Sequence, residues 1–167
     1  MIKNLFLLVA IGVLFSCKSD AQDASEKAET FPVTKTESEW KAQLSDKEYY
    51  VLREAGTERA GSSELNKNYK PGTYICAACS TPLFKSEHKF DSGTGWPSFD
   101  REIEGNVAFS TDNNLGYTRT EEHCATCGGH LGHVFNDGPR ETTGKRHCIN
   151  GAALDFIPEG EKLPKNE

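Results

Sequence analysis

The segment TGKRHCING, residues 143–151, contains a cysteine whose neighbours could make it a nucleophile. If this segment is a strand, alternation of its side chains puts Arg146, Cys148 and Asn150 on the same face. A permanent positive charge near a thiol favours the thiolate, so we predict that the pKa of Cys148 lies below the free-cysteine value of about 8.5. The alternative is an inert cysteine buried in a core strand. The local sequence leaves both interpretations open.

The other cysteines of the folded part form two C-x-x-C pairs, CAAC and CATC. Two such pairs supply the four thiolates that a structural Zn²⁺ prefers, and Gly128 and Gly129 follow the second pair where a tight turn needs them. We therefore predict a zinc site whose loss would destabilise the fold. The alternative is disulfide chemistry, either as redox motifs or as structural bridges. The four predicted ligands are Cys76, Cys79, Cys124 and Cys127.

Two further segments could build a pocket for a small substrate. HLGHVF supplies His130 and His133, and SGTGWPSF supplies Trp96 and Phe99 after a Gly-Thr-Gly turn. An aromatic wall beside polar histidines suits a substrate with an apolar methyl group and a polar oxygen. Separately, the histidines could be structural or bind a metal, and the aromatic residues could belong to the core.

These residues need a scaffold, and the first part of the folded chain predicts two short helices. Two possible capping boxes, TESE from Thr36 and SDKE from Ser45, indicate helices at about 37–44 and 46–54, and Gly56 follows the second. We expect the two helices to pack on the rest of the domain through Trp40, Leu44, Tyr49, Tyr50 and Leu52.

Beyond Gly56, short β-rich segments are separated by glycine, asparagine and proline, which predicts a mostly antiparallel β domain capped by the helices. The segments are GTYICA, NVAFSTD, GYTRTEEHC, HLGHVF, KRHCIN and AALDFIP. We expect one folded domain over 36–158 and a polar tail over 159–167. The formal net charge of −6 argues against a nucleic-acid surface.

The first residues have the layout of an export signal. Residues 1–16 carry Lys3 and then an apolar run too short to span a membrane as a stable helix. The sequence LFSC resembles the lipobox of bacterial lipoproteins, in which the cysteine, here Cys17, is lipidated and becomes the mature N-terminus. A plain secretory signal is the alternative, and both predict export. Residues 17–35 are polar, and we predict that they form a flexible tether. Membrane attachment would then come from the lipid alone.

Four segments in order resemble the methionine-R-sulfoxide reductases of the B type. They are CAAC, FDSGTGWPSFD, CATCGGHLGHVFNDGP and TGKRHCINGAALDF, and the resemblance covers roughly residues 38–158. It implies a mainly β fold of two antiparallel sheets, Mss4-like or β-sandwich-like, with peripheral helices and a structural Zn²⁺ held by the two C-x-x-C pairs. It also implies a substrate, methionine R-sulfoxide, either free or in proteins.

The resemblance assigns a role to each matching position. Cys148 corresponds to the catalytic cysteine, Trp96 to the residue that contacts the substrate methyl group, and His130 and His133 to the histidines that bind and protonate the sulfoxide oxygen. Attack by the thiolate with protonation of the oxygen would release methionine and leave a sulfenic acid on Cys148. The residues that match others lining or organising the pocket are Phe135, Arg146 and Asn150.

The sequence departs from the family at Thr94, where many members have a second cysteine that closes a disulfide with the catalytic one. We therefore expect a one-cysteine cycle in which an external thiol reductant, such as an exported thioredoxin-like protein, attacks the sulfenic acid. Two other functions use the same residues differently. A zinc-ribbon module for protein binding would need no reactive Cys148, and a thiol–disulfide oxidoreductase using the C-x-x-C pairs would bind no zinc.

Overall fold

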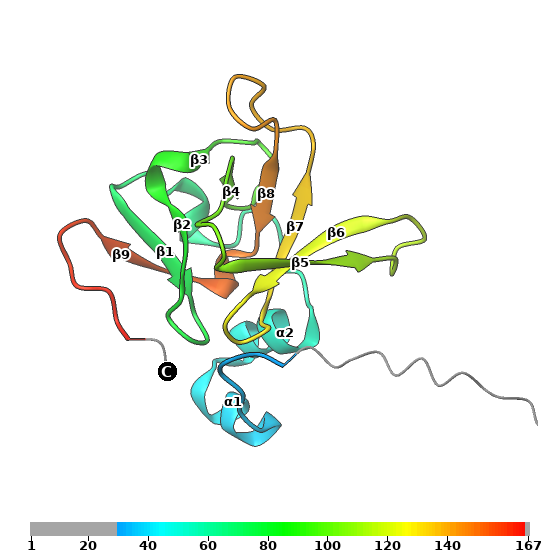
Figure 1. Cartoon of the computed structure of the whole chain (residues 1–167), viewed down its shortest axis with the longest axis vertical. Coiled ribbons are helices and arrows are strands. Elements are labelled where there is room, and N and C mark those ends of the chain that lie inside the picture. The colour runs from blue at the N-terminus through cyan, green and yellow to red at the C-terminus, as the bar shows by residue number, and fades with distance from the viewer. Residues whose placement is uncertain (1–29, 166–167) are drawn as a thin grey trace, which may run out of the picture.

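The computed structural model of the chain describes residues 30–165, and within this range nine strands form two antiparallel sheets (Figure 1). The smaller sheet has the order β2-β1-β9 and the larger one the order β3-β4-β8-β7-β6-β5. The smaller sheet consists of β1 Gly72–Cys76, β2 Pro82–Lys85 and β9 Leu154–Pro158. The larger consists of β3 Lys89–Phe90, β4 Ser98–Phe99, β5 Val107–Asp112, β6 Arg119–Cys124, β7 His130–Phe135 and β8 Arg146–Ile149.

A cluster of aromatic rings joins the two sheets. Phe99 of β4 stacks on Phe84 of β2 with ring centroids 4.4 Å apart, and Tyr74 of β1 contacts Phe99 edge-on at 5.0 Å. All three side chains are fully buried. Offset-stacked and edge-on ring pairs contribute about 0.5–1.5 kcal/mol each beyond the burial of their area, so this cluster fixes how the sheets meet.

Two short helices cover one end of the sheets (Figure 1), as the capping boxes predict. Helix α1 spans Glu37–Gln43 and α2 spans Asp46–Glu54, and both capping boxes form. Helix α2 is followed by Ala55, whose backbone is left-handed with a φ of 52°, and then by Gly56, whose φ is not positive. Tyr50 is 48% exposed rather than a core contact, whereas Trp40 and the rest of the predicted set are buried or pack against the core.

All six predicted β segments form strands, and three further strands were not anticipated. Those three, β2, β3 and β4, have only two to four residues, too few to show a periodic pattern. Single 3₁₀ turns at Glu64–Lys67, Ser86–His88 and Gly151–Ala153 complete the fold. Among the described residues, no helix is long and apolar enough to cross a membrane. The predicted signal, Cys17 and most of the tether lie outside the described residues.

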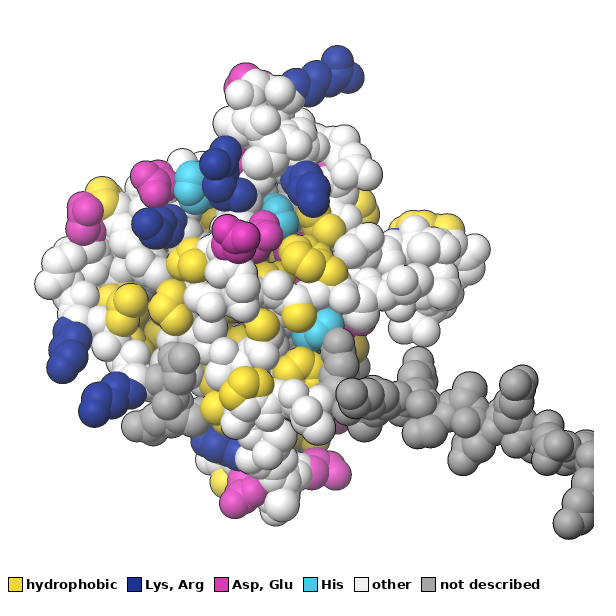
Figure 2. Space-filling view, viewed as in Figure 1, with side chains coloured by type: hydrophobic (Ala, Val, Ile, Leu, Met, Phe, Trp, Pro, Cys, Tyr) yellow, Lys and Arg dark blue, Asp and Glu magenta, His cyan; other side chains and the backbone are white. Residues whose placement is uncertain are grey.

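Hairpin β5–β6 projects from the body of the molecule, seen as a ribbon in Figure 1 and as a lobe in Figure 2. Its two strands pair in continuous register from Val107 and Cys124 to Asp112 and Arg119. The exposed tip carries Leu115, which is 61% exposed. Because β7 pairs with β6, the base of this hairpin is continuous with the strands that contain the predicted site.

Candidate active site and metal centre

A small cavity of about 130 Å³ opens beside β8, and Cys148 is in its wall. It brings together five residues that the sequence predicted and two that it did not. They are Trp96, His133, Phe135, Cys148 and Asn150, with Thr57 and Arg119. A larger hollow of about 690 Å³ lies over the small sheet, but no cysteine or histidine lines it.

The alternation predicted for β8 is confirmed. Cys148 and Asn150 face the cavity, whereas His147 and Ile149 are fully buried on the opposite side. On the buried side, His147 Nδ1 lies 2.5 Å from Oε1 of Glu122, itself fully buried. Strand β8 therefore has a face that borders the cavity and a face that packs in the interior.

Gly132 lets β7 approach β8 closely. A Cβ atom at this position would lie 2.0 Å from the carbonyl oxygen of Cys148, which no backbone adjustment within a paired strand could relieve cheaply. The absence of a side chain therefore sets the spacing between β7 and β8.

A β-bulge brings the two histidines of β7 to the same face. Residues three apart on a regular strand point to opposite faces, but the β6–β7 register shifts so that Leu131 is an extra residue. As a result, the rings of His130 and His133 lie 5.5 Å apart, edge to face. Only His133 borders the cavity; His130 packs behind it, buried.

A carboxylate holds each histidine from the neighbouring strands. Asp112 Oδ2 lies 2.7 Å from His133 Nε2, and Glu121 Oε1 lies 2.6 Å from His130 Nδ1. The backbone N–H of Asn114 and the His133 ring lower the pKa of Asp112 to about 2, so it is an ionised acceptor at neutral pH. Burial lowers the pKa of His133, and its bond to Asp112 opposes that shift.

Arg119 shares the Asp112 carboxylate with His133 and also lines the cavity. Neither Asp112 nor Arg119 was predicted from the sequence. They stand directly opposite each other in hairpin β5–β6, and they reach the site only because β6 pairs with β7. Knowledge of this register would have identified them, whereas the local pattern of each strand contains no signal for their position.

The prediction that Arg146 lowers the pKa of Cys148 below the free value is wrong. Burial of the thiol raises its pKa, and the contacts with Thr94 and Arg146 offset this only in part. Most of the guanidinium faces elsewhere, because Nε and Nη2 of Arg146 bind both oxygens of Asp137 at 2.8 and 2.9 Å. The guanidinium lies 4.5 Å from the centre of the Phe135 ring, so Arg146 supports the cavity wall without lining it.

Thr94 stands next to the sulfur of Cys148, at the position where the sequence resemblance expects a second cysteine in many family members. Its Oγ1 is 3.9 Å from Cys148 Sγ. Thr94 also contacts the Ser92 hydroxyl at 2.8 Å, and Ser92 contacts that of Ser98 at 2.7 Å. A chain of hydroxyl groups therefore runs from the β4 strand to the thiol.

The four cysteines of the C-x-x-C pairs form one buried cluster, with all ligand atoms within 4.8 Å of one another. The Sγ atoms of Cys76 and Cys127 are 3.7 Å apart, and those of Cys79 and Cys124 are 3.5 Å apart. Tetrahedral coordination with Zn–S bonds of about 2.3 Å requires separations near 3.8 Å, so the donor set fits such an ion. All four thiols are free, which disagrees with the disulfide alternative.

The two halves of this cluster have the same backbone structure. In each, the N–H four residues after the first cysteine donates to the carbonyl of that cysteine: Ser80 to Cys76 and Gly128 to Cys124, both at 2.8 Å. Ser80 and Gly128 both have positive φ values, 62° and 69°. The prediction that Gly128 serves a tight turn is therefore confirmed. The two turns join the end of β1 in one sheet to the end of β6 in the other.

Comparisons with known proteins agree with this geometry. The SelR domain family matches residues 44–158. The chain belongs to the MsrB family. A protein named peptide methionine sulfoxide reductase MsrB in Leptospira interrogans is 50% identical over 130 residues, which cover 77% of this chain and 98% of the relative. Its namesake in Thiobacillus denitrificans is 52% identical over 126 residues, or 75% and 95% of the two chains.

A plant relative extends the comparison. Peptide methionine sulfoxide reductase B1, chloroplastic, of Arabidopsis thaliana is 49% identical over 140 residues, which cover 83% of this chain and 68% of the relative. Membership of the MsrB family agrees with the mainly β fold, the two antiparallel sheets and the four-cysteine cluster.

Proposed function

We propose that this chain reduces the R epimer of methionine sulfoxide, free or in proteins, to methionine. The observation that carries the proposal is the cavity that unites Cys148, Trp96 and His133, since a nucleophile, an apolar ring and a polar ring then face the same small space. Membership of the MsrB family and the printed names of its members support the same reaction.

In the proposed reaction, the Cys148 sulfur attacks the sulfoxide sulfur while the oxygen takes up a proton. A sulfoxide is a poor electrophile until its oxygen is protonated or strongly hydrogen-bonded, and His133 at the cavity, with His130 behind it, is suited to that role. Asp112 binds the His133 ring and Glu121 binds the His130 ring, so the two carboxylates hold both rings in place. The S–O bond of the substrate breaks and its oxygen passes to the Cys148 sulfur. The substrate sulfur is thereby reduced by two electrons to the thioether of methionine, and Cys148 is oxidised by two electrons to a sulfenic acid.

The other pocket residues receive the roles that the sequence predicts. Trp96 contacts the methyl group, Phe135 completes the apolar wall, and Asn150 orients the substrate. Arg146 does not contact the substrate; its guanidinium packs on the Phe135 ring and holds that ring in the cavity wall. The four-cysteine cluster holds a structural Zn²⁺, which supplies stability and takes no part in the reaction.

Single-turnover measurements on the soluble chain from about Ala24, with separated R and S epimers of a chromophore-tagged methionine sulfoxide, test the proposal. We expect one equivalent of the R epimer to be consumed per chain without added reductant, and the S epimer to remain. If neither epimer reacts while the protein is folded and metal-loaded, the chain is a zinc-containing binding module instead.

Regeneration of Cys148 is proposed to need an external thiol, such as an exported thioredoxin-like protein. The mature cysteines other than Cys148 and Cys17 belong to the four-thiol cluster, and Thr94 stands where a resolving cysteine would be. A reductant thiol would attack the sulfenic acid to form a mixed disulfide and water, and a second thiol would then release Cys148.

Substitution Thr94→Cys should convert this cycle to one with an internal disulfide. The hydroxyl of Thr94 is 3.9 Å from the Cys148 sulfur, so a thiol introduced there is within reach of the sulfenic acid. After one turnover we expect peptide mapping to find residues 94 and 148 disulfide-linked, and dimedone labelling of Cys148 to be lost. Thr94→Ser is the matched control and should keep full dimedone labelling. An internal disulfide of Cys148 in the unmodified chain would contradict the one-cysteine cycle.

The chain is proposed to work outside the cytoplasm, attached to a membrane through lipid on Cys17. The support is the sequence alone: an apolar segment after Lys3, a lipobox-like LFSC and a polar tether. The enzyme would then repair exported proteins facing the periplasm or the cell exterior.

A further inference from the structure

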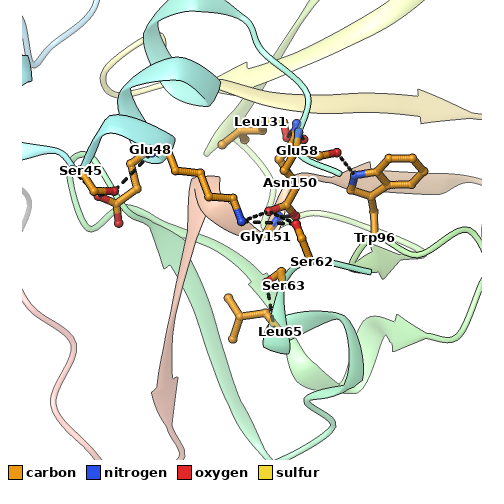
Figure 3. Close-up of polar contacts among 11 residues, drawn as sticks. Ser45, Glu48, Glu58, Ser62, Ser63, Leu65, Trp96, Leu131, Asn150 and Gly151 are labelled. Carbon is orange, nitrogen blue, oxygen red and sulfur yellow. Dashed lines mark hydrogen bonds and ion pairs between the residues drawn. The ribbon is translucent and has the colours of Figure 1, made fainter. Parts of the chain in front are cut away.

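Glu58 is a buried acid in the segment between α2 and the 3₁₀ turn at Glu64–Lys67, and no sequence pattern drew attention to it. Its side chain has no exposed surface. Oε1 accepts a hydrogen bond from the backbone N–H of Gly151 at 2.5 Å, and Oε2 lies 2.8 Å from Nζ of Lys47 and accepts from the Ser62 hydroxyl at 3.3 Å. Figure 3 shows Ser62 and Gly151 beside the carboxylate.

The backbone of Glu58 holds two residues of the cavity. Its N–H donates to Oδ1 of Asn150 at 3.0 Å, and its carbonyl accepts from Nε1 of Trp96 at 3.2 Å (Figure 3). Asn150 in turn donates from Nδ2 to the carbonyl of Leu131, the extra residue of the β7 bulge. One peptide segment therefore connects the aromatic wall, the amide of the pocket and the strand that carries the histidines.

The carboxylate fixes that segment in place. Gly151 directly follows Asn150, which lies at the end of the catalytic strand, so the bond from its N–H ties Glu58 to β8. Lys47 ties the same carboxylate to α2. A buried carboxylate is stable only with such partners, and a segment held at both its side chain and its backbone has little freedom to move.

We propose that Glu58 is a positioning residue for the substrate pocket. Its carboxylate binds α2 and the end of β8, and its backbone then sets the positions of Trp96 and Asn150. The inference rests on the proposed reductase function and deepens it, because Trp96 and Asn150 are the groups assigned to substrate binding.

Substitution Glu58→Gln tests this role. The amide keeps one acceptor for Gly151 but presents N–H groups to Lys47, so the segment should loosen. We expect the KM for the R-sulfoxide to rise about tenfold, the equivalent of about 1.4 kcal/mol of binding, with kcat changed less than about threefold. If Glu58 has only a structural role, the substitution should lower the stability of the fold without raising KM more than it changes kcat.

Acrylamide quenching of tryptophan fluorescence gives a readout that needs no turnover. The chain has two tryptophans, and Trp40 is buried, so quenching reports mainly on Trp96. We expect the quenching constant to rise about twofold in Glu58→Gln, because the backbone carbonyl that binds the Trp96 ring becomes more mobile. The quenching measurement tests the positioning role of Glu58 even if the wild-type chain reduces no sulfoxide. A lack of sulfoxide reduction would refute only the proposed function.

Glu37→Gln is the matched control, since Glu37 pairs with Lys41 on the exposed face of α1 and should leave KM and quenching unchanged. If Glu58→Gln does not fold, Lys47→Met removes the other end of the ion pair from a half-exposed position. We expect that variant to fold and to raise KM and quenching in the same direction by a smaller factor. Wild-type KM and quenching in a folded Glu58→Gln or Lys47→Met variant would overturn the proposal.

Discussion

Substitution Cys148→Ser should abolish methionine sulfoxide reduction while leaving the fold and the metal content of the protein unchanged. The side chain faces the cavity and takes no part in the four-cysteine cluster, so removing its sulfur leaves the contacts between the sheets unchanged. A serine hydroxyl is a far weaker nucleophile at neutral pH, and its oxygen cannot accept a second oxygen as sulfur does. We expect the single-turnover rate to fall by at least about 10³-fold, the scale on which removal of a nucleophile acts.

The same variant separates the competing functions. The measurements are epimer-resolved substrate loss, zinc per chain and the thermal unfolding midpoint. If the chain is instead a thiol–disulfide oxidoreductase that uses the C-x-x-C pairs, its activity should not change when residue 148 is replaced. R-sulfoxide reduction by Cys148→Ser at a rate near that of the wild type would therefore contradict the mechanism, whatever the metal content.

The sequence predicted those parts of the site that depend on chemistry local to one segment. The C-x-x-C pairs specify a four-thiol cluster without any knowledge of topology, and the alternation around Cys148 correctly separates this cavity residue from the buried His147. The two capping boxes specify where α1 and α2 begin. Each of these features is encoded within a few consecutive residues.

The parts that were missed depend on register and on burial. Asp112 and Glu121 reach the histidines because β5, β6 and β7 pair in a particular register, and the Leu131 bulge that turns His130 toward His133 has no local signature. The pKa of Cys148 was predicted in the wrong direction because its burial could not be read from the sequence. Glu58 was missed because its segment is neither a helix nor a strand.

Substitution Cys124→Ser should unfold the domain or leave it markedly less stable. The apparent binding free energy of a structural Zn²⁺ is about 10–16 kcal/mol, which equals or exceeds the whole stability of an ordinary domain. Here the cluster brings Cys76 at the end of β1 against Cys124 at the end of β6, so a metal held by these thiols would link the two sheets. We expect the variant to retain no stoichiometric zinc and to lose at least about 10 °C in Tm.

The helices should lose order together with the metal, because they are attached to the cysteine turns. Nη1 of Arg53 in α2 donates to the carbonyl of Cys127 at 3.0 Å, and Nε2 of Gln43 in α1 donates to that of Ala78 at 2.7 Å. Far-ultraviolet circular dichroism and zinc analysis on the same sample follow both events. Cys148→Ser is the matched control, since it also replaces one thiol but should keep zinc and Tm. A Cys124→Ser variant with wild-type Tm would show that the sheets hold together without the metal, and that the aromatic cluster of Tyr74, Phe84 and Phe99 suffices.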